Sequence, residues 1–166
     1  MKIAYLGLGT NLGDREENLR VAAEMLASDR LRVKRASSIF ETAPRDVLDQ
    51  PFFLNQVLEV ETDLFPRQLF TRAKQVERKM GRVRSQPKGP RLIDVDILLY
   101  GDSVVHVEGL EIPHAGIPAR RFVLEPLAEL APEFRHPVTK RTIRQMLAEV
   151  SDQAVKRLGL RLAEQP

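Results

Sequence analysis

The chain has 166 residues, a length that suits one domain with a real hydrophobic core, so we expect a single domain over residues 1–166. It holds no cysteine, which excludes a disulfide framework, a thiolate metal site and a cysteine nucleophile, and its 26 basic and 23 acidic residues leave a formal net charge of only +3. No apolar run approaches the roughly 18 residues of a membrane span, and the first residues carry no signal-peptide cleavage pattern, so we expect a cytoplasmic protein without a membrane partner.

The sequence predicts a strand and then a helix at the N-terminus. Residues 2–9 are mostly apolar and end in glycines, and an Asp-x-x-Glu capping box that begins at Asp14 opens a helix that runs to about residue 28. The glycines from Gly7 to Gly13 follow the spacing G-x-G-x-x-x-G. A dinucleotide-binding loop needs G-x-G-x-x-G, and no P-loop Lys-Ser/Thr follows, so the spacing argues against both kinds of loop.

Strand and helix patterns continue along the rest of the chain. Period-two spacing predicts strands over 31–40, 53–61, 92–100, 104–105, 110–112 and 158–162. Helical spacing predicts helices over 65–80, with Gly81 as C-cap, over 120–130, and from 139 or 140 to 150. Connections that are too short for a crossover helix make the strands they join antiparallel, which we expect for 31–40 with 53–61 and for 92–100 with the two short strands after it. The predicted fold class is therefore α+β, a mainly antiparallel sheet with helices on both faces.

Two aspartates interrupt the apolar strand over 92–100. Side chains alternate along a strand, so Asp94 and Asp96 point the same way, with Cα atoms roughly 6.5 Å apart. The opposite face is then apolar and must be core: Ile93, Val95, Ile97 and Leu99. Two carboxylates on a half-buried face repel each other and resist ionisation unless a cation lies between them. Oxygen ligands favour Mg²⁺, and substrate phosphates usually complete the coordination of that ion. A solvated edge strand is the alternative, but Asp is depleted in strands.

A basic segment leads directly into this strand. Residues 78–91 contain six Lys and Arg and no acidic residue, together with two glycines and two prolines that indicate a loop. A cationic loop beside an anionic metal site suits a polyphosphate bound with its metal. Nucleic acid is the competing partner, but aromatic side chains for base stacking are few, with two Tyr, seven Phe and no Trp.

Four segments in this order resemble the 6-hydroxymethyl-7,8-dihydropterin pyrophosphokinase family of folate biosynthesis. They are AYLGLGTNLG at 4–13, DQPFFLN at 49–55, GRVR with GPRLIDVDI within 81–97, and IPH at 112–114. The resemblance implies a ferredoxin-like fold and the transfer of pyrophosphate from ATP to the hydroxymethyl oxygen of the dihydropterin, which releases AMP. It also implies two Mg²⁺ ions held by Asp94 and Asp96. We expect a monomer that acts on these two small molecules and not on nucleic acid.

The resemblance also assigns roles to individual residues. It implies catalytic roles for Arg82, Arg91, Asp94 and Asp96; ATP contacts at Lys74, Glu77, Arg82, Arg84, Arg91, Ile97, His114 and Arg120; and pterin contacts at Thr42, Ala43, Arg45, Phe53, Asn55, Asp94 and Phe122. These residue types suit the chemistry. Arginine forks bind phosphate oxygens bidentately, phenyl rings stack on a flat bicycle, and an asparagine amide both donates and accepts. His106 and His136 match no family position and are expected at the surface.

Two other functions compete with this one. A small module for RNA or single-stranded DNA would use the 78–91 segment against phosphates and phenylalanines as stacking platforms, but the aspartate pair would repel that backbone. A metal-dependent nuclease or phosphatase could use the same pair, but the further acidic or histidine ligands that such sites commonly gather are missing from the motif.

Overall fold

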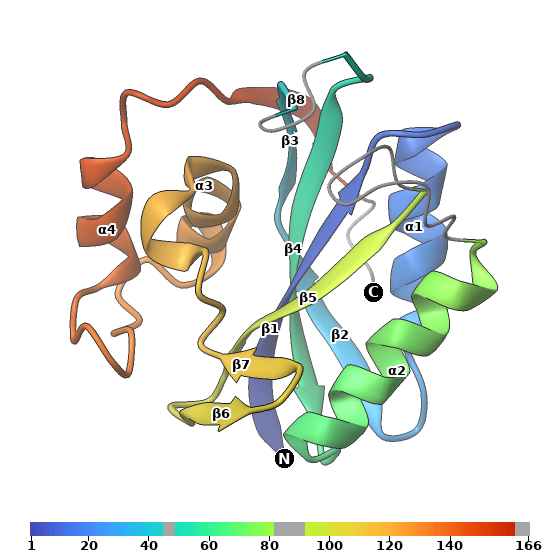
Figure 1. Ribbon diagram of the computed structural model, residues 1–166, viewed down its shortest axis with the longest axis vertical. Coiled ribbons are helices and arrows are strands. Elements are labelled where there is room, and N and C mark those ends of the chain that lie inside the picture. The colour runs from blue at the N-terminus through green and yellow to red at the C-terminus, as the bar shows by residue number, and fades with distance from the viewer. Residues whose placement is uncertain (45–48, 82–91, 162–166) are drawn as a thin grey trace.

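The computed structural model describes residues 1–44, 49–81 and 92–161, and its main sheet has six strands (Figure 1). In chain order the elements are β1 (Lys2–Thr10), α1 (Arg15–Leu26), β2 (Leu31–Ala36), β3 (Ser38–Thr42), β4 (Phe53–Thr62), α2 (Pro66–Lys79), β5 (Asp94–Tyr100), β6 (Val105–Val107), β7 (Leu110–Ile112), the 3₁₀ helix η1 (Ile117–Ala119), α3 (Arg121–Leu130), α4 (Ile143–Glu149) and β8 (Lys156–Arg161). No helix of the described part is long and apolar enough to cross a membrane.

The sheet runs in the order β5-β1-β4-β3-β8, and β2 also pairs with β4. Every ladder among the described strands is antiparallel. Helix α1 connects β1 to β2 across β4, and α2 connects β4 to β5 across β1, which is the split β-α-β arrangement of ferredoxin-like folds. The predicted fold class is therefore confirmed.

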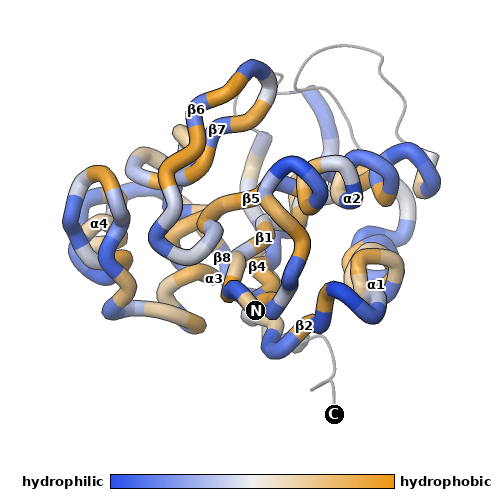
Figure 2. Tube along the Cα trace, turned by 90° about the horizontal axis from the view of Figure 1, so that it is seen from below, coloured by the Kyte–Doolittle hydropathy of each residue, from blue (hydrophilic) through white to orange (hydrophobic). Residues whose placement is uncertain are grey.

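Each face of the sheet has its own hydrophobic core. Ala4 and Leu6 of β1 pack with α1 and α2 on one face, and Tyr5 packs with α3 and α4 on the other. Figure 2 shows the hydrophobic residues concentrated in the central strands between these two helical layers. Alternate side chains of β1 therefore belong to two different cores, which is why its sequence is apolar on both faces.

Local signals set the start of α1 and both ends of α2 close to where the sequence predicts them, whereas α1 ends at Leu26 and α4 begins only at Ile143. The Asp14 carboxylate accepts a hydrogen bond from the Glu17 backbone N–H at 3.1 Å, as an N-cap does. Pro66 begins α2, and the Gln68 side chain accepts from the Phe65 backbone N–H at 2.9 Å. Gly81 follows α2 with φ +81°, a conformation that favours glycine.

The structure corrects three predictions about strands. Residues 31–40 form two strands because the Ser37 hydroxyl accepts the Val57 backbone N–H at 2.9 Å, which replaces a ladder bond. The strand over 92–100 does not pair with the two short strands; β5 pairs with β1, and β6 and β7 form a hairpin of their own. The crossover through α2 places β5 beside β1. The nine residues of β1 offer a longer pairing partner than the three residues of β6 or of β7.

The third correction concerns Leu99. The register of β5 against β1 shifts between Tyr5 and Leu6, so one extra residue stands in β5. Val95 and Ile97 pack toward α1 and α2 as predicted, but Leu98 and Leu99 both pack toward α3 and α4. A strict period of two cannot foresee this bulge.

The two histidines outside the motifs differ. The His106 side chain is exposed, as predicted, whereas His136 is 5% exposed, so its predicted surface position is wrong. The His136 Nδ1 accepts hydrogen bonds from the backbone N–H groups of Val138 and Thr139, both at 3.2 Å. This turn gives the ring a structural role, and burial lowers the pKa of His136.

Candidate active site

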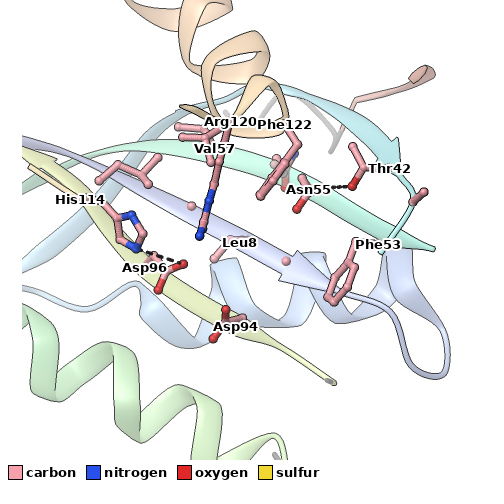
Figure 3. A pocket seen from close by; sticks show the side chains of 16 residues that line it. Leu8, Thr42, Phe53, Asn55, Val57, Asp94, Asp96, His114, Arg120 and Phe122 are labelled. Atoms are coloured by element: carbon pink, nitrogen blue, oxygen red, sulfur yellow. Dashed lines mark hydrogen bonds and ion pairs between the residues drawn. The ribbon is translucent and has the colours of Figure 1, made fainter. Parts of the chain in front are cut away.

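A cavity of about 320 Å³ opens on the sheet face that α3 covers (Figure 3). Nine of the predicted site residues line it: Thr42, Ala43, Phe53, Asn55, Asp94, Asp96, His114, Arg120 and Phe122. They come from β3, β4, β5 and α3 and from the connections that follow β3, β7 and η1. The fold thus gathers residues that are up to 80 positions apart in the sequence.

Two glycines of β1 form the floor of this cavity. The register pairs Gly9 with Asp94 of β5 on one side and with Asn55 of β4 on the other, and it pairs Gly7 with Asp96. Alternate residues of a strand point to the same face, so at these two positions the central strand places no side chain on the cavity face. This role was not predicted from the sequence; two glycines spaced by one residue inside an apolar strand are the signal that could have indicated it.

The two aspartates lie on the cavity face of β5, as the alternation predicts. Burial raises the pKa of Asp96 to about 7, and the neighbouring Asp94 carboxylate adds to this. The positive side chains of Lys74 and Arg120 act in the opposite direction but do not offset it. Among the described residues, Lys74 and Arg120 thus leave the negative charge at Asp96 incompletely balanced, and a bound cation would add positive charge there.

His114 stands beside Asp96 as a neutral hydrogen-bond donor. Its Nδ1 accepts from the Gly116 backbone N–H at 3.0 Å, so the neutral ring carries its proton on Nε2. That Nε2 lies 3.9 Å from Asp96 Oδ2. Burial, with the nearby Arg120 guanidinium, lowers the pKa of His114 and keeps the ring uncharged near neutral pH.

The other end of the cavity offers an amide and two aromatic rings. The Asn55 Nδ2 donates to Thr42 Oγ1 at 2.9 Å, which fixes the orientation of that amide. Phe53 belongs to β4 and Phe122 to α3, and both rings point into the cavity (Figure 3). This end can hold a flat, polar-edged heterocycle.

Arg120 brings a guanidinium into the cavity from above the sheet. Figure 3 shows it pointing inward between His114 and Phe122, and its Cζ lies 5.7 Å from the Phe122 ring centroid. The cavity therefore places a cation opposite the aspartates of β5.

Three residues predicted to contact ATP do not line the cavity. Ile97 is 5% exposed and packs in the core on the other face of the sheet, so its side chain cannot reach the cavity. Glu77 is 2% exposed, and its Oε2 accepts the Val95 backbone N–H at 2.8 Å while Lys74 Nζ lies 3.3 Å from its Oε1. These two side chains lie where α2 packs against β5. The predicted positions Arg45, Arg82, Arg84 and Arg91 lie outside the described residues.

Comparisons with known proteins agree with the motifs. The sequence model of the 7,8-dihydro-6-hydroxymethylpterin-pyrophosphokinase (HPPK) family matches residues 5–132. A 2-amino-4-hydroxy-6-hydroxymethyldihydropteridine pyrophosphokinase of Methylorubrum extorquens is 39% identical over 95% of this chain and 99% of its own length. The folic acid synthesis protein fol1 of Schizosaccharomyces pombe is 42% identical over 93% of this chain, but the chain spans only 21% of that protein.

The fold is also shared with a solved structure. A crystal structure of Plasmodium falciparum HPPK-DHPS superposes with a TM-score of 0.70 over 90% of this chain and 43% of that one, at 18% identity, which shows a shared fold. The chain belongs to the 7,8-dihydro-6-hydroxymethylpterin-pyrophosphokinase family, as its four motifs predict.

Proposed function

We propose that this chain transfers the pyrophosphoryl group of ATP to the hydroxyl of 6-hydroxymethyl-7,8-dihydropterin. The hydroxymethyl oxygen attacks the β-phosphorus, the bond from that phosphorus to the α–β bridging oxygen breaks, and AMP leaves while the hydroxyl loses its proton. The observation that carries the proposal is the cavity itself. It presents two carboxylates and a guanidinium at one end and two phenyl rings with a fixed amide at the other.

The donor set fits magnesium. Among the described residues no three His, Asp or Glu side chains gather as a metal-binding group, so a cation here would have two protein carboxylates and would need further oxygens. Mg²⁺ commonly binds in this way, with substrate phosphates and water completing its six ligands. Asp94 and Asp96 would hold the two expected ions, which when bound neutralise phosphate charge and lower the pKa of the attacking hydroxyl.

The residues of the chain would position both substrates. The Asn55 amide and Thr42 would hold the polar edge of the pterin, while Phe53 and Phe122 would stack on its rings. This arrangement would direct the hydroxymethyl group toward the aspartates. Such positioning is the main contribution of proteins to phosphoryl transfer.

The polyphosphate would bind to donors at the other end. His114 would donate from Nε2–H to a phosphate oxygen, and Arg120 would add a charged fork. Arg82, Arg84 and Arg91 would contact ATP and Arg45 would contact the pterin, as the family resemblance implies. Lys74 would act through its charge near Asp96.

The test is a coupled assay for AMP release from ATP. We expect AMP only when both the dihydropterin and Mg²⁺ are present, and no AMP after chelation with EDTA. AMP release without pterin would refute the assignment, as would inactivity combined with salt-dependent oligonucleotide binding. We also propose that the protein is a cytoplasmic monomer, and sedimentation of the active protein would test the monomeric state.

A further inference from the structure

Arg120 stands at a helix N-terminus where a small capping residue is the rule. It is the N-cap of α3, and its side chain makes no capping hydrogen bond there. Ser, Thr, Asp and Asn are preferred at this position because the first N–H groups of a helix have no partner inside the helix. The guanidinium instead points into the cavity (Figure 3), so another residue must satisfy the helix terminus.

Gln153, in the turn that follows α4, supplies that partner. Its Oε1 accepts the Arg121 backbone N–H at 2.9 Å, and its Nε2 donates to the Ala119 carbonyl at 2.8 Å. One side-chain amide therefore binds the backbone on both sides of Arg120. The main chain that carries the cavity arginine is fixed at its two neighbouring residues.

Arg121, at the start of α3, binds the turn after α4 in return. Its Nη1 donates to the carbonyls of Gln153 and Ser151 at 2.6 and 3.0 Å, and its Nη2 donates to Glu125 at 2.9 Å. The turn after α4 and the start of α3 thus bind each other through four hydrogen bonds of Gln153 and Arg121, which we call the Gln153 clamp.

Gly116 helps to fix the position of the Arg120 guanidinium. A Cβ at Gly116 would lie only 2.9 Å from Arg120 Nε and Cζ, so the arginine packs directly over this glycine backbone. The Arg120 side chain is held by Gly116 and the Phe122 ring, and its backbone is held by Gln153.

We propose that Gln153 is a positioning residue for the polyphosphate of ATP and acts through Arg120. The inference rests on the proposed function, because it assumes that Arg120 contacts ATP. Gln153 lies outside residues 5–132, which match the family. The C-terminal part of the chain would therefore contribute to substrate binding without lining the cavity.

The first experiment is a double-mutant cycle on the dissociation constant of MgATP, which needs neither pterin nor turnover. We expect Gln153→Ala to weaken MgATP binding roughly fivefold, as expected when two neutral hydrogen bonds that order a ligand-binding arginine are lost. In an Arg120→Ala background the same substitution should have almost no effect. Asp152→Ala is the matched control, since this exposed residue belongs to the same turn, and it should leave the affinity unchanged.

A second readout separates the clamp from general destabilisation. Amide hydrogen exchange at Arg121 should accelerate in Gln153→Ala and not in Asp152→Ala, because only the first removes the acceptor of that N–H. Gln153→Glu keeps this acceptor but loses the donor to Ala119, so it should weaken MgATP binding while Arg121 stays protected.

The outcomes distinguish this inference from the proposed function. Equal effects of Gln153→Ala in both backgrounds, unchanged Arg121 exchange, or an Arg120→Ala variant with normal MgATP affinity would each overturn it. A wild-type chain that binds MgATP with the expected coupling but releases no AMP with pterin would refute the proposed function and leave the clamp standing.

Discussion

Replacement of Gly9 by alanine should make the protein slightly more stable and much less able to bind the pterin. The Gly9 backbone is not among the positive-φ positions, and a Cβ there would lie 3.4 Å from Asn55 Oδ1, an ordinary contact. Alanine therefore fits without strain. It also restricts the unfolded chain, so we expect the free energy of unfolding to rise by about 0.4–1 kcal/mol.

The same methyl group would stand on the floor of the cavity. A flat ligand stacked between Phe53 and Phe122 over this floor has little room to move away from it. Overpacking of this kind costs about 1–3 kcal/mol, which corresponds to a rise in the dissociation constant for the pterin of about 5- to 150-fold. The affinity for ATP should change much less.

Thermal unfolding and titration of each substrate would measure both effects. Gly109→Ala is the matched control: it lies outside the cavity lining, has open space around it and has φ +80°. That variant should lose stability and keep its pterin affinity. A Gly9→Ala variant that binds pterin normally would refute the glycine floor, and one that unfolds more easily than the wild type would refute the reasoning about strain.

Three further predictions follow from the charged groups. Asp96→Ala should nearly abolish AMP formation without lowering the melting temperature, because it removes a repelled carboxylate; a near-normal rate would refute its assignment as a metal ligand. Glu77→Ala should lower the free energy of unfolding by about 1–3 kcal/mol, since the buried Val95 N–H loses its acceptor; an unchanged denaturation midpoint would contradict this. Arg35 holds the pKa of Glu59 below its usual value, so the stabilisation from this carboxylate is present above its unfolded-state pKa and is lost as the pH falls through the lower folded value. Between about pH 5 and pH 3 the melting temperature of the wild type should therefore fall more than that of Glu59→Gln, and parallel curves would contradict the assignment.

The shared face of Asp94 and Asp96 could be predicted from the sequence because it depends only on residues close together in the chain. Strand alternation fixes which side chains share a face over a few residues, and short motifs with unusual composition carry a family resemblance. The start of α1 was likewise predictable, since the capping side chain of Asp14 lies within one turn of the group that it satisfies.

The tertiary structure decided the features that depend on which strands become neighbours. Only the pairing of β1 between β5 and β4 makes Gly7 and Gly9 the floor of a cavity, and only the bulge in β5 moves Leu99 to the other face. The contact of Gln153 with the backbone around Arg120 spans more than 30 residues. Long-range contacts of this kind follow from the packing of whole elements, so no local pattern of residues encodes them.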